Sequence, residues 1–365
     1  MMTTEIKKIG ILTGGGDCPG LNAVIRGITR TAILEYGIEV VGFMNGYKGL
    51  FKGETIKLDL DYVSDILPKG GTVIYTSNKT NLFRMPFEED GETIYKDLSD
   101  VGVKNIKEAG IDALIILGGD GTLTSARDFH RKGVNIIAVP KTIDNDLACT
   151  DITFGFDTAV AVATDALDRL RTTAMSHHRI MCLEVMGRYV GWIALESGLA
   201  GGADAILLPE IPYDINKLAD KIKEDIKNGK EYSIVVVAEG AKSVTGEMVV
   251  KNVVEDSPDP IRLGGIADQV SKELEELVGL ESRATVLGHI QRGGSPTAFD
   301  RNISTRYGKA AVDLAMEGKF GHMATLKGNK IGSALLEDVI GQLKNVDPEG
   351  ELLSTAKSIG ITFGD

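Results

Sequence analysis

The feature that most constrains the fold is a repeating order of segments: a short apolar run, a polar or glycine-rich turn, and an amphipathic stretch. The first case is KIGILT, followed by GGGDCPG and then by LNAVIRGITRTAILEY. Further apolar runs lie in IEVVGFMNG, IDALIILGGDGT, VNIIAVPKT, RIMCLEVMGR, ADAILLPE, YSIVVVAEG and RATVLGHIQRGG. Short runs rich in Ile, Val and Leu are typical of strands buried on both faces of a parallel sheet.

The stretches between these runs have a helical period. An example is DINKLADKIKEDIKNG, where we expect Gly229 to cap the end of the helix. Alternating strands and helices predict an α/β fold with mostly parallel sheets and right-handed crossovers. About eight strands is many for one sheet, and 365 residues suit about two domains. We therefore expect two Rossmann-like three-layer lobes, with the chain crossing between them more than once and the active site in the cleft between them.

Charge and cysteine content exclude some classes of partner and site. The net charge of -12 argues against a nucleic acid or an anionic membrane as partner. Cys18, Cys149 and Cys182 have no C-x-x-C spacing, which favours reduced packing residues over disulfides or zinc. The N-terminus lacks the apolar core of a signal peptide, and no apolar run has membrane-spanning length. We expect a cytoplasmic protein.

Polar, glycine-rich loops follow the strands, at the sheet edge where ligands bind in such folds. The stretch GGGDCPGLN, from Gly14 to Asn22, lies between a strand and a helix. Its glycines would let the backbone approach a phosphate, and the following helix N-terminus favours anions. It matches neither the dinucleotide nor the Walker fingerprint, so a phosphate loop and a simple tight turn both stay open.

The stretch LGGDGTLTSA is a stronger signal. Its backbone amides could cradle phosphates while Asp120 holds a magnesium ion, and Thr122 could cap the next helix. Gly121 would leave open space beside the phosphates. The alternative is an acidic turn with an N-cap.

The next strand leads into PKTIDNDLACTD, which carries Asp144, Asp146 and Asp151 behind Lys141. A carboxylate near the cleft can take a proton from a substrate hydroxyl if positive groups keep it ionised. Thr142 could donate a hydrogen bond to a transferring phosphoryl group. Asp146 is expected to organise the loop or to assist on the magnesium side.

Several arginines end or border the later strands, and we expect them at one sheet edge as a pocket for a phosphorylated substrate. They are Arg179, Arg188, Arg283 and Arg292. His289, close to Arg292, is interpreted as a hydrogen-bond partner of the substrate. Glu239, after the strand SIVVV, could bind sugar hydroxyls or simply open a helix.

Five motifs, in this order and with ordinary spacing, resemble those of 6-phosphofructokinases. They are LTGGGDCPGLNAVIRG, GGDGT, PKTIDND, EVMGRYVGWIAL and ATVLGHIQRGGSPTAFDR, and the resemblance covers roughly residues 7 to 330. It implies transfer of a phosphoryl group to the 1-hydroxyl of fructose 6-phosphate in glycolysis. It also implies a donor lobe of residues 1–155 plus about 292–341, and a sugar lobe of residues 156–291 plus about 342–365.

The resemblance assigns roles residue by residue. Asp144 matches the general base, Thr142 and Arg188 match residues that steady the transferring group, and Asp120 matches the magnesium-linked acid. Donor contacts are expected from Gly15, Lys79, Gly119, Asp120, Gly121 and Thr122. Sugar-phosphate contacts are expected from Thr142, Ile143, Asp144, Met186, Gly187, Arg188, Glu239, His289 and Arg292. Arg179 and Arg283 match arginines that reach in from a neighbouring subunit, so a homodimer or homotetramer with shared sites is expected.

One departure concerns the nucleotide. Where many ATP-using members carry an arginine after GGT, this chain offers Asn78 in direct register, or Lys79 after a one-residue insertion. A lysine keeps the charge but loses the bidentate fork of an arginine.

Two positions report on the phosphoryl donor within this family, and here they disagree. Gly121 is typical of ATP users, whereas Lys141 before TIDND is typical of pyrophosphate users. An acid at position 121 would repel and crowd the α-phosphate, while one extra cation excludes neither donor. We therefore expect ATP with Mg²⁺, and pyrophosphate as the alternative.

Two more distant alternatives are another kinase with GGDGT and a non-catalytic regulatory subunit. NAD kinases and diacylglycerol-type lipid kinases share GGDGT but lack the MGR and GHIQRGG loops. A non-catalytic subunit would be expected to lose Asp144 or Asp120, and both are present.

Overall fold

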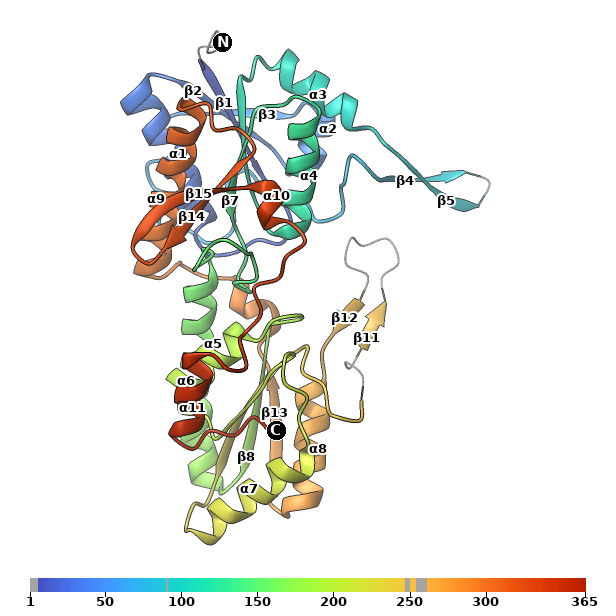
Figure 1. The fold of residues 1–365 in the computed structure, drawn as a ribbon, viewed down its shortest axis with the longest axis vertical. Coiled ribbons are helices and arrows are strands. Elements are labelled where there is room, and N and C mark those ends of the chain that lie inside the picture. Colours follow the sequence, from blue (N-terminus) through green and yellow to red (C-terminus); the bar gives the residue numbers. More distant parts are fainter. Residues whose placement is uncertain (1–5, 90, 247–249, 254–260) are drawn as a thin grey trace.

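A computed structural model describes residues 6–89, 91–246, 250–253 and 261–365. Its two main sheets, one mostly and one wholly parallel, lie end to end in an elongated molecule (Figure 1). The first sheet has seven strands in the order β15-β14-β7-β6-β1-β2-β3. Its strands are β1 (Lys8–Thr13), β2 (Glu39–Phe43), β3 (Thr55–Leu58), β6 (Ala113–Gly118), β7 (Ile136–Pro140), β14 (His322–Lys327) and β15 (Lys330–Leu335). The edge strands β3 and β15 are antiparallel to their neighbours, and the other pairs are parallel.

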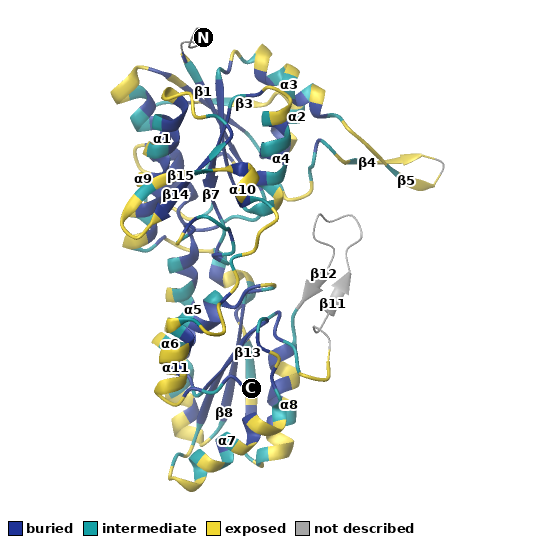
Figure 2. Ribbon diagram, viewed as in Figure 1, coloured by how far each residue is buried: buried dark blue, intermediate teal, exposed yellow. Residues whose placement is uncertain are grey.

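The second sheet is entirely parallel and has the order β13-β8-β10-β9. Its strands are β8 (Ile180–Val185), β9 (Ala205–Leu207), β10 (Ser233–Ala238) and β13 (Ser282–Val286). All eight apolar runs noted in the sequence are strands, and the two-lobed α/β fold is confirmed. The strands stand out as the buried centre of each lobe (Figure 2).

Alternate residues of each central strand face opposite helix layers, which explains the continuous apolar runs. In β6, Ile115 and Leu117 pack in one cluster with residues of α1 (Leu21–Tyr36) and α9 (Ala298–Met316). The intervening Leu114 and Ile116 pack in a second cluster. That cluster draws on α2 (Tyr47–Lys52), α3 (Ser99–Glu108), α4 (Asp120–Arg131) and α10 (Leu336–Val339).

The second lobe repeats this arrangement with its own helices. They are α5 (Phe156–His177), α6 (Trp192–Ala200), α7 (Ile215–Lys227), α8 (Ile266–Val278) and α11 (Glu351–Ser358). The cluster that contains Ile115 and Leu117 continues through α5 to Leu183 and Val236 of the second sheet. The two lobes therefore share one continuous apolar core.

The chain passes from the first lobe to the second before α5, returns before α9, and passes over again after α10 (Figure 1). A short 3-10 helix, η1 (Gly288–Arg292), precedes the return. Two hairpins lie outside the main sheets: β4 (Met85–Glu89) with β5 (Glu92–Lys96), and β11 (Val250–Val253) with β12 (Ile261–Leu263).

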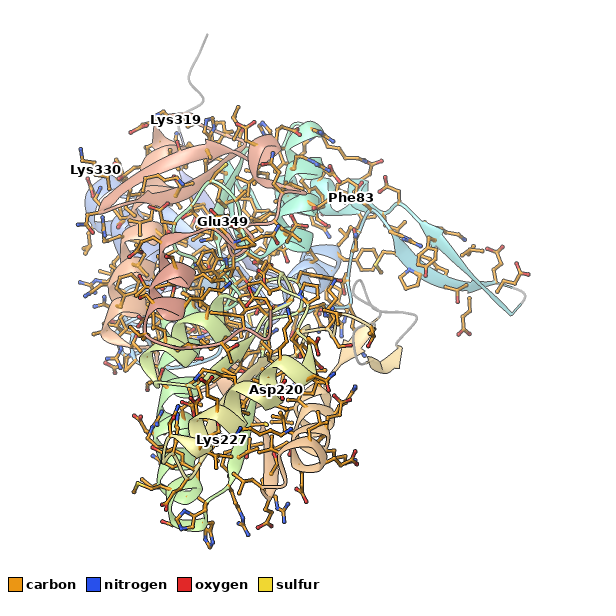
Figure 3. All side chains as sticks on the ribbon, turned by 60° about the horizontal axis from the view of Figure 1, so that its bottom comes forward. Phe83, Asp220, Lys227, Lys319, Lys330 and Glu349 are labelled. Carbon is orange, nitrogen blue, oxygen red and sulfur yellow. The ribbon has the colours of Figure 1, made fainter. Side chains whose placement is uncertain are left out.

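The helix α7 shows how closely a sequence pattern locates an element. It ends one residue earlier than expected, because its C-cap is Asn228 and not Gly229. Gly229 follows with a φ of 94°, a conformation that glycine adopts without strain. The outward face of α7 carries exposed charged side chains, including Asp220 and Lys227, as do the surfaces around Lys319 and Lys330 of the first lobe (Figure 3).

Among the residues that the structure describes, no helix combines the length and the apolar character needed to cross a membrane.

Candidate active site

Loops from both sheets meet where the lobes join, because the parallel strands of each sheet end there. In the first sheet, the ends of β1, β6 and β7 are adjacent, with Thr13 opposite Leu117 and Gly118 opposite Pro140. In the second sheet, the end of β8 lies between the ends of β10 and β13. The glycine-rich and charged loops of the sequence therefore come from neighbouring strands.

The loop after β1 turns at Gly15, whose φ is 77°. Gly15 N donates to Ser77 O over 3.3 Å, and Thr76 Oγ1 donates to Gly15 O over 2.7 Å. These bonds hold the segment after GGT against the glycine loop. Asn78 and Lys79 follow directly and are exposed at the side of this loop.

The loop after β6 leads directly into α4, whose N-cap is Gly119 and whose first residue is Asp120. Gly121 is exposed, and a Cβ added there would meet no other atom within 4 Å. The open space expected beside Gly121 is therefore present.

The expectation that Thr122 caps the helix is wrong. Thr122 lies inside the first turn of α4, no side chain caps this helix, and Thr122 N donates to Gly119 O. Its side chain fills the space between the ends of β1 and β6, where a Cβ at Gly14 or Gly118 would overlap it. A larger residue at either position would force the Thr122 side chain to move.

Asp120 is held by the C-terminal part of the chain, since its Oδ1 accepts a hydrogen bond of 3.0 Å from Gly341 N. No group of three His, Cys, Asp or Glu side chains in the described ranges is arranged to hold a metal ion. Mg²⁺ usually binds one or two carboxylates together with substrate phosphates and water, so Asp120 is a residue that would hold it. Asp144 and Asp146 each have a buried Oδ1 without a hydrogen-bond partner among the described residues, so hard oxygen atoms are available nearby.

Lys141 is buried, and its Nζ donates to Gly16 O over 2.5 Å. Burial lowers the pKa of its ammonium, and Arg292 acts in the same direction. The guanidinium of Arg292 lies against Gly16 and donates from Nη1 to Asp17 O over 3.4 Å. The first glycine loop is therefore covered by one cation from its own lobe and one from η1.

Asp144 has three cationic side chains near its carboxyl group. Its backbone N donates to Thr142 Oγ1 over 3.1 Å. Burial raises the pKa of its carboxyl group, and Arg292, Lys141 and Arg188 oppose this rise. These cations come from both lobes and favour the ionised carboxylate, whereas burial and the nearby Glu239 raise its pKa above that of an ordinary aspartate.

The other two acids of the loop have different surroundings. Burial raises the pKa of Asp146 to about 6, and the nearby Asp144 adds to the rise. Asp151 is exposed and accepts hydrogen bonds from Lys327 Nζ over 3.0 Å and from Gly328 N over 2.6 Å. Asp151 therefore ties the loop to the turn between β14 and β15.

In the second lobe, the MGR loop after β8 lies beside the AEG loop after β10. Gly240 N donates to Gly187 O over 3.1 Å, and the φ of 137° at Gly187 requires a glycine. Burial raises the pKa of Glu239, while Arg188 lowers it. Arg188 thus lowers the pKa of both Asp144 and Glu239, so the three charged groups lie close enough to interact.

Gln291 is a site residue that the sequence analysis missed. It is fully buried in η1, and its Oε1 accepts a hydrogen bond of 2.7 Å from Met186 N. In the same GHIQRGG loop, His289 is exposed and Arg292 is half-buried. A buried glutamine between such residues gives no periodic signal, so the sequence alone could not single it out.

Arg179 and Arg283 do not lie at this edge, and the expectation of four arginines at one edge is wrong for them. Arg179 precedes β8, and Arg283 is the second residue of β13, paired with Met181. Both therefore lie at the amino edge of the second sheet, where both form ion pairs with Glu281. A six-residue strand at about 3.3 Å per residue puts roughly 15–20 Å between them and the MGR loop.

The fold and these loops define a class: two-lobed parallel α/β proteins with a glycine-rich, charged site at the carboxyl ends of their strands. The chain belongs to the phosphofructokinase family, since the family model named Phosphofructokinase matches residues 8–315.

Individual relatives agree with the family. The chain is 64% identical over 366 residues, the whole of both chains, to a Clostridium perfringens protein named ATP-dependent 6-phosphofructokinase 2. It is 46% identical to a Streptomyces coelicolor protein named pyrophosphate–fructose 6-phosphate 1-phosphotransferase, over 98% of this chain and 100% of that one. A solved structure, Pichia pastoris phosphofructokinase in the T-state, matches with a TM-score of 0.76 and 35% identity. That match covers 92% of this chain but only 35% of the larger yeast chain.

Proposed function

We propose that this chain is an ATP-dependent 6-phosphofructokinase, which transfers the terminal phosphoryl group of ATP to the 1-hydroxyl of fructose 6-phosphate. The product is fructose 1,6-bisphosphate. The observation that carries the proposal is Asp144, whose buried Oδ1 has no hydrogen-bond partner among the described residues and whose carboxylate has three cations near it. Relatives of both named activities share this family, and the relative with 64% identity over its whole length is named for ATP.

In the mechanism, Asp144 accepts the proton of the 1-hydroxyl as that oxygen attacks the phosphoryl group. Thr142 and Arg188 orient the transferring group and balance its charge, since such transfers depend mainly on positioning and electrostatics. The sugar phosphate is bound by Met186, Gly187, Glu239, His289 and Arg292, together with the backbone at Ile143. Glu239 accepts hydrogen bonds from sugar hydroxyls, and Arg292 binds phosphate oxygens.

The phosphoryl donor is bound on the first lobe, by Gly15 and by the stretch from Gly119 to Thr122. Lys79 places a positive charge beside the donor phosphates. Asp120 would hold Mg²⁺, which supplies neutralisation of charge on the donor phosphates when it is bound.

The choice of ATP over pyrophosphate is supported by Gly121 and Lys141. The open space at Gly121 leaves room for the α-phosphate of a nucleotide. Lys141 Nζ already donates to Gly16 O, so its charge stabilises the glycine loop as well as any phosphate. Pyrophosphate is the second candidate donor, because Lys141 is the residue typical of pyrophosphate users.

In this proposal, each lobe binds one of the two substrates. Residues 1–155 with about 292–341 bind the donor, and residues 156–291 with about 342–365 bind the sugar phosphate. Arg179 and Arg283 point to an oligomer, because they lie at the edge of the sheet remote from their own MGR loop. We infer that they complete the sugar-phosphate site of a neighbouring subunit.

A donor comparison tests the proposed function. The purified protein should convert fructose 6-phosphate when ATP and Mg²⁺ are supplied. A coupled assay that detects fructose 1,6-bisphosphate and ADP measures this conversion. Turnover with pyrophosphate alone would replace the ATP proposal by the pyrophosphate one, and no turnover with either donor would refute both.

The surroundings of Asp144 predict a pH dependence. Because burial raises its pKa, the base becomes protonated, and kcat/KM is lost, at a higher pH than for an ordinary aspartate. Lys141→Met removes a charge that lowers this pKa. The acid limb of kcat/KM for fructose 6-phosphate should then move to higher pH. The control is Lys327→Met, which removes an exposed lysine bound to Asp151. A limb that stays in place in Lys141→Met would contradict this account of Asp144.

A further inference from the structure

Residues 341–346, here called the crossing segment, connect α10 of the first lobe to α11 of the second. At its start, Gly341 N donates to Asp120 Oδ1 over 3.0 Å. Further along, Lys344 N donates to Asp146 O over 2.9 Å. The crossing segment thus contacts both the acid at the start of α4 and the loop that carries the proposed base.

The same segment is anchored on the second lobe. Val346 N donates to Glu210 Oε1 over 2.9 Å, and this oxygen also accepts from Gly191 N over 3.0 Å. Trp192 Nε1 donates to Lys344 O over 2.7 Å, and the Lys344 ammonium lies 5.5 Å from the centre of the Trp192 ring. The backbone of Lys344 is therefore fixed from both lobes.

The Lys344 ammonium binds the base loop at several points. Its Nζ donates to Asn145 Oδ1 over 2.7 Å, to Asp151 O over 2.6 Å and to Thr150 O over 3.2 Å. A lysine has three hydrogens to donate, and these acceptors use all of them. The ammonium group therefore holds three oxygen atoms of one loop close together.

Asn145 follows Asp144 directly, and its backbone is in the left-handed region with a φ of 54°. Such a conformation costs about 1 kcal/mol or more for a residue other than glycine and persists where the surroundings hold it. Asn145 Oδ1 is held by the lysine and by Thr153 N, which donates over 3.1 Å. The direction of the chain at Asn145 sets where the Asp144 carboxylate lies.

We propose that Lys344 is a positioning residue for the phosphoryl transfer, acting through Asn145 to hold the Asp144 carboxylate against the site. The proposal rests on the proposed function, since it gives Asp144 the role of base. It assigns the C-terminal crossing segment a part in catalysis, although none of its side chains is among the substrate contacts proposed above.

The first test is Lys344→Met, which keeps the length of the side chain and removes its charge and donors. We expect kcat with ATP to fall by about 10- to 100-fold, as for a displacement of a reacting group by roughly 1 Å. The KM for fructose 6-phosphate should change by less than about twofold, because the residues proposed to bind the sugar phosphate are intact. Acrylamide quenching of Trp192, the only tryptophan of the chain, should stay unchanged if the crossing segment remains in place.

Two further variants separate positioning from a general structural role. Lys344→Arg restores a cation and should recover part of the lost kcat. Asn145→Gly suits the left-handed backbone and removes the side chain that binds the lysine and Thr153 N. Its loss of kcat and that of Lys344→Met should not add in the double variant, because both break the same link. If Lys344→Met does not fold, the test depends on Asn145→Gly alone. A normal kcat in that variant then overturns the proposal.

The matched control is Lys357→Met, which removes an exposed lysine of α11 that pairs with Asp365. Its kcat should equal that of the unchanged protein. A folded Lys344→Met with unaltered kcat overturns the proposal while leaving the proposed function intact. Absence of turnover in the unchanged protein would refute the proposed function instead.

Discussion

Replacing Asp144 by Asn should lower kcat by about 10²- to 10⁴-fold, the range that a general base contributes. Asn has nearly the same shape, so it keeps the backbone bond to Thr142 Oγ1, but it cannot accept the proton of the 1-hydroxyl. Asp144→Ser should give a loss of the same order. Steady-state rates with ATP and Mg²⁺, together with equilibrium binding of fructose 6-phosphate, measure the effect.

Binding of fructose 6-phosphate should be retained in both variants, because the sugar-phosphate contacts come mainly from other loops. The control is Asp151→Asn, a carboxylate of the same loop that is exposed and bound to Lys327 and Gly328. It should lose little rate. Near-normal turnover in Asp144→Asn would remove this residue from the role of base.

The second large effect is expected from Gly121→Asp. The fold has room for the new side chain, and an acid in the first turn of α4 suits the helix dipole. Its charge would face the α-phosphate of ATP, and like charges in contact cost several kcal/mol. We expect kcat/KM for ATP to fall by about 10²-fold, and any turnover with pyrophosphate, which has no α-phosphate of a nucleotide, to fall far less.

Gly121→Asn is the matched control, since it adds nearly the same volume without the charge. If Asn lowers ATP use as much as Asp does, crowding and not charge discriminates between the donors. Equal loss with ATP and with pyrophosphate would argue against any role of position 121 in donor choice.

The sequence predicted the central strands and the loops that follow them, because burial on both faces leaves a strong apolar signal. The strands that it missed are exposed or short, except β14, which has six residues and is mostly buried. In β14, Met323, Ala324 and Leu326 are buried, but residues of these types favour helices as much as strands. The edge strand β15 and the hairpin of β4 and β5 are mostly exposed and carry no continuous apolar run.

Long-range contacts account for the errors at the site. The sequence pattern predicts that an arginine beside an apolar run lies at the end of the strand, whereas Arg179 stands before β8 and Arg283 near the start of β13. Gln291 and Lys344 bind loops that are 105 and 199 residues away in the sequence, and no local pattern records such contacts. The resemblance to the family links these two arginines to a neighbouring subunit, and that role stays a prediction.

The repeated crossing of the chain has a consequence for synthesis on the ribosome. The strand β7 pairs with β14, which is translated only after the whole sheet of the second lobe. Until β14 emerges, one side of β7 has no strand to bind, and the apolar face that α9 covers is open. Unpaired strand edges of this kind promote aggregation of nascent chains. The sheet that begins the sequence is thus completed only after the sheet of the second lobe, when β14 and β15 have been translated.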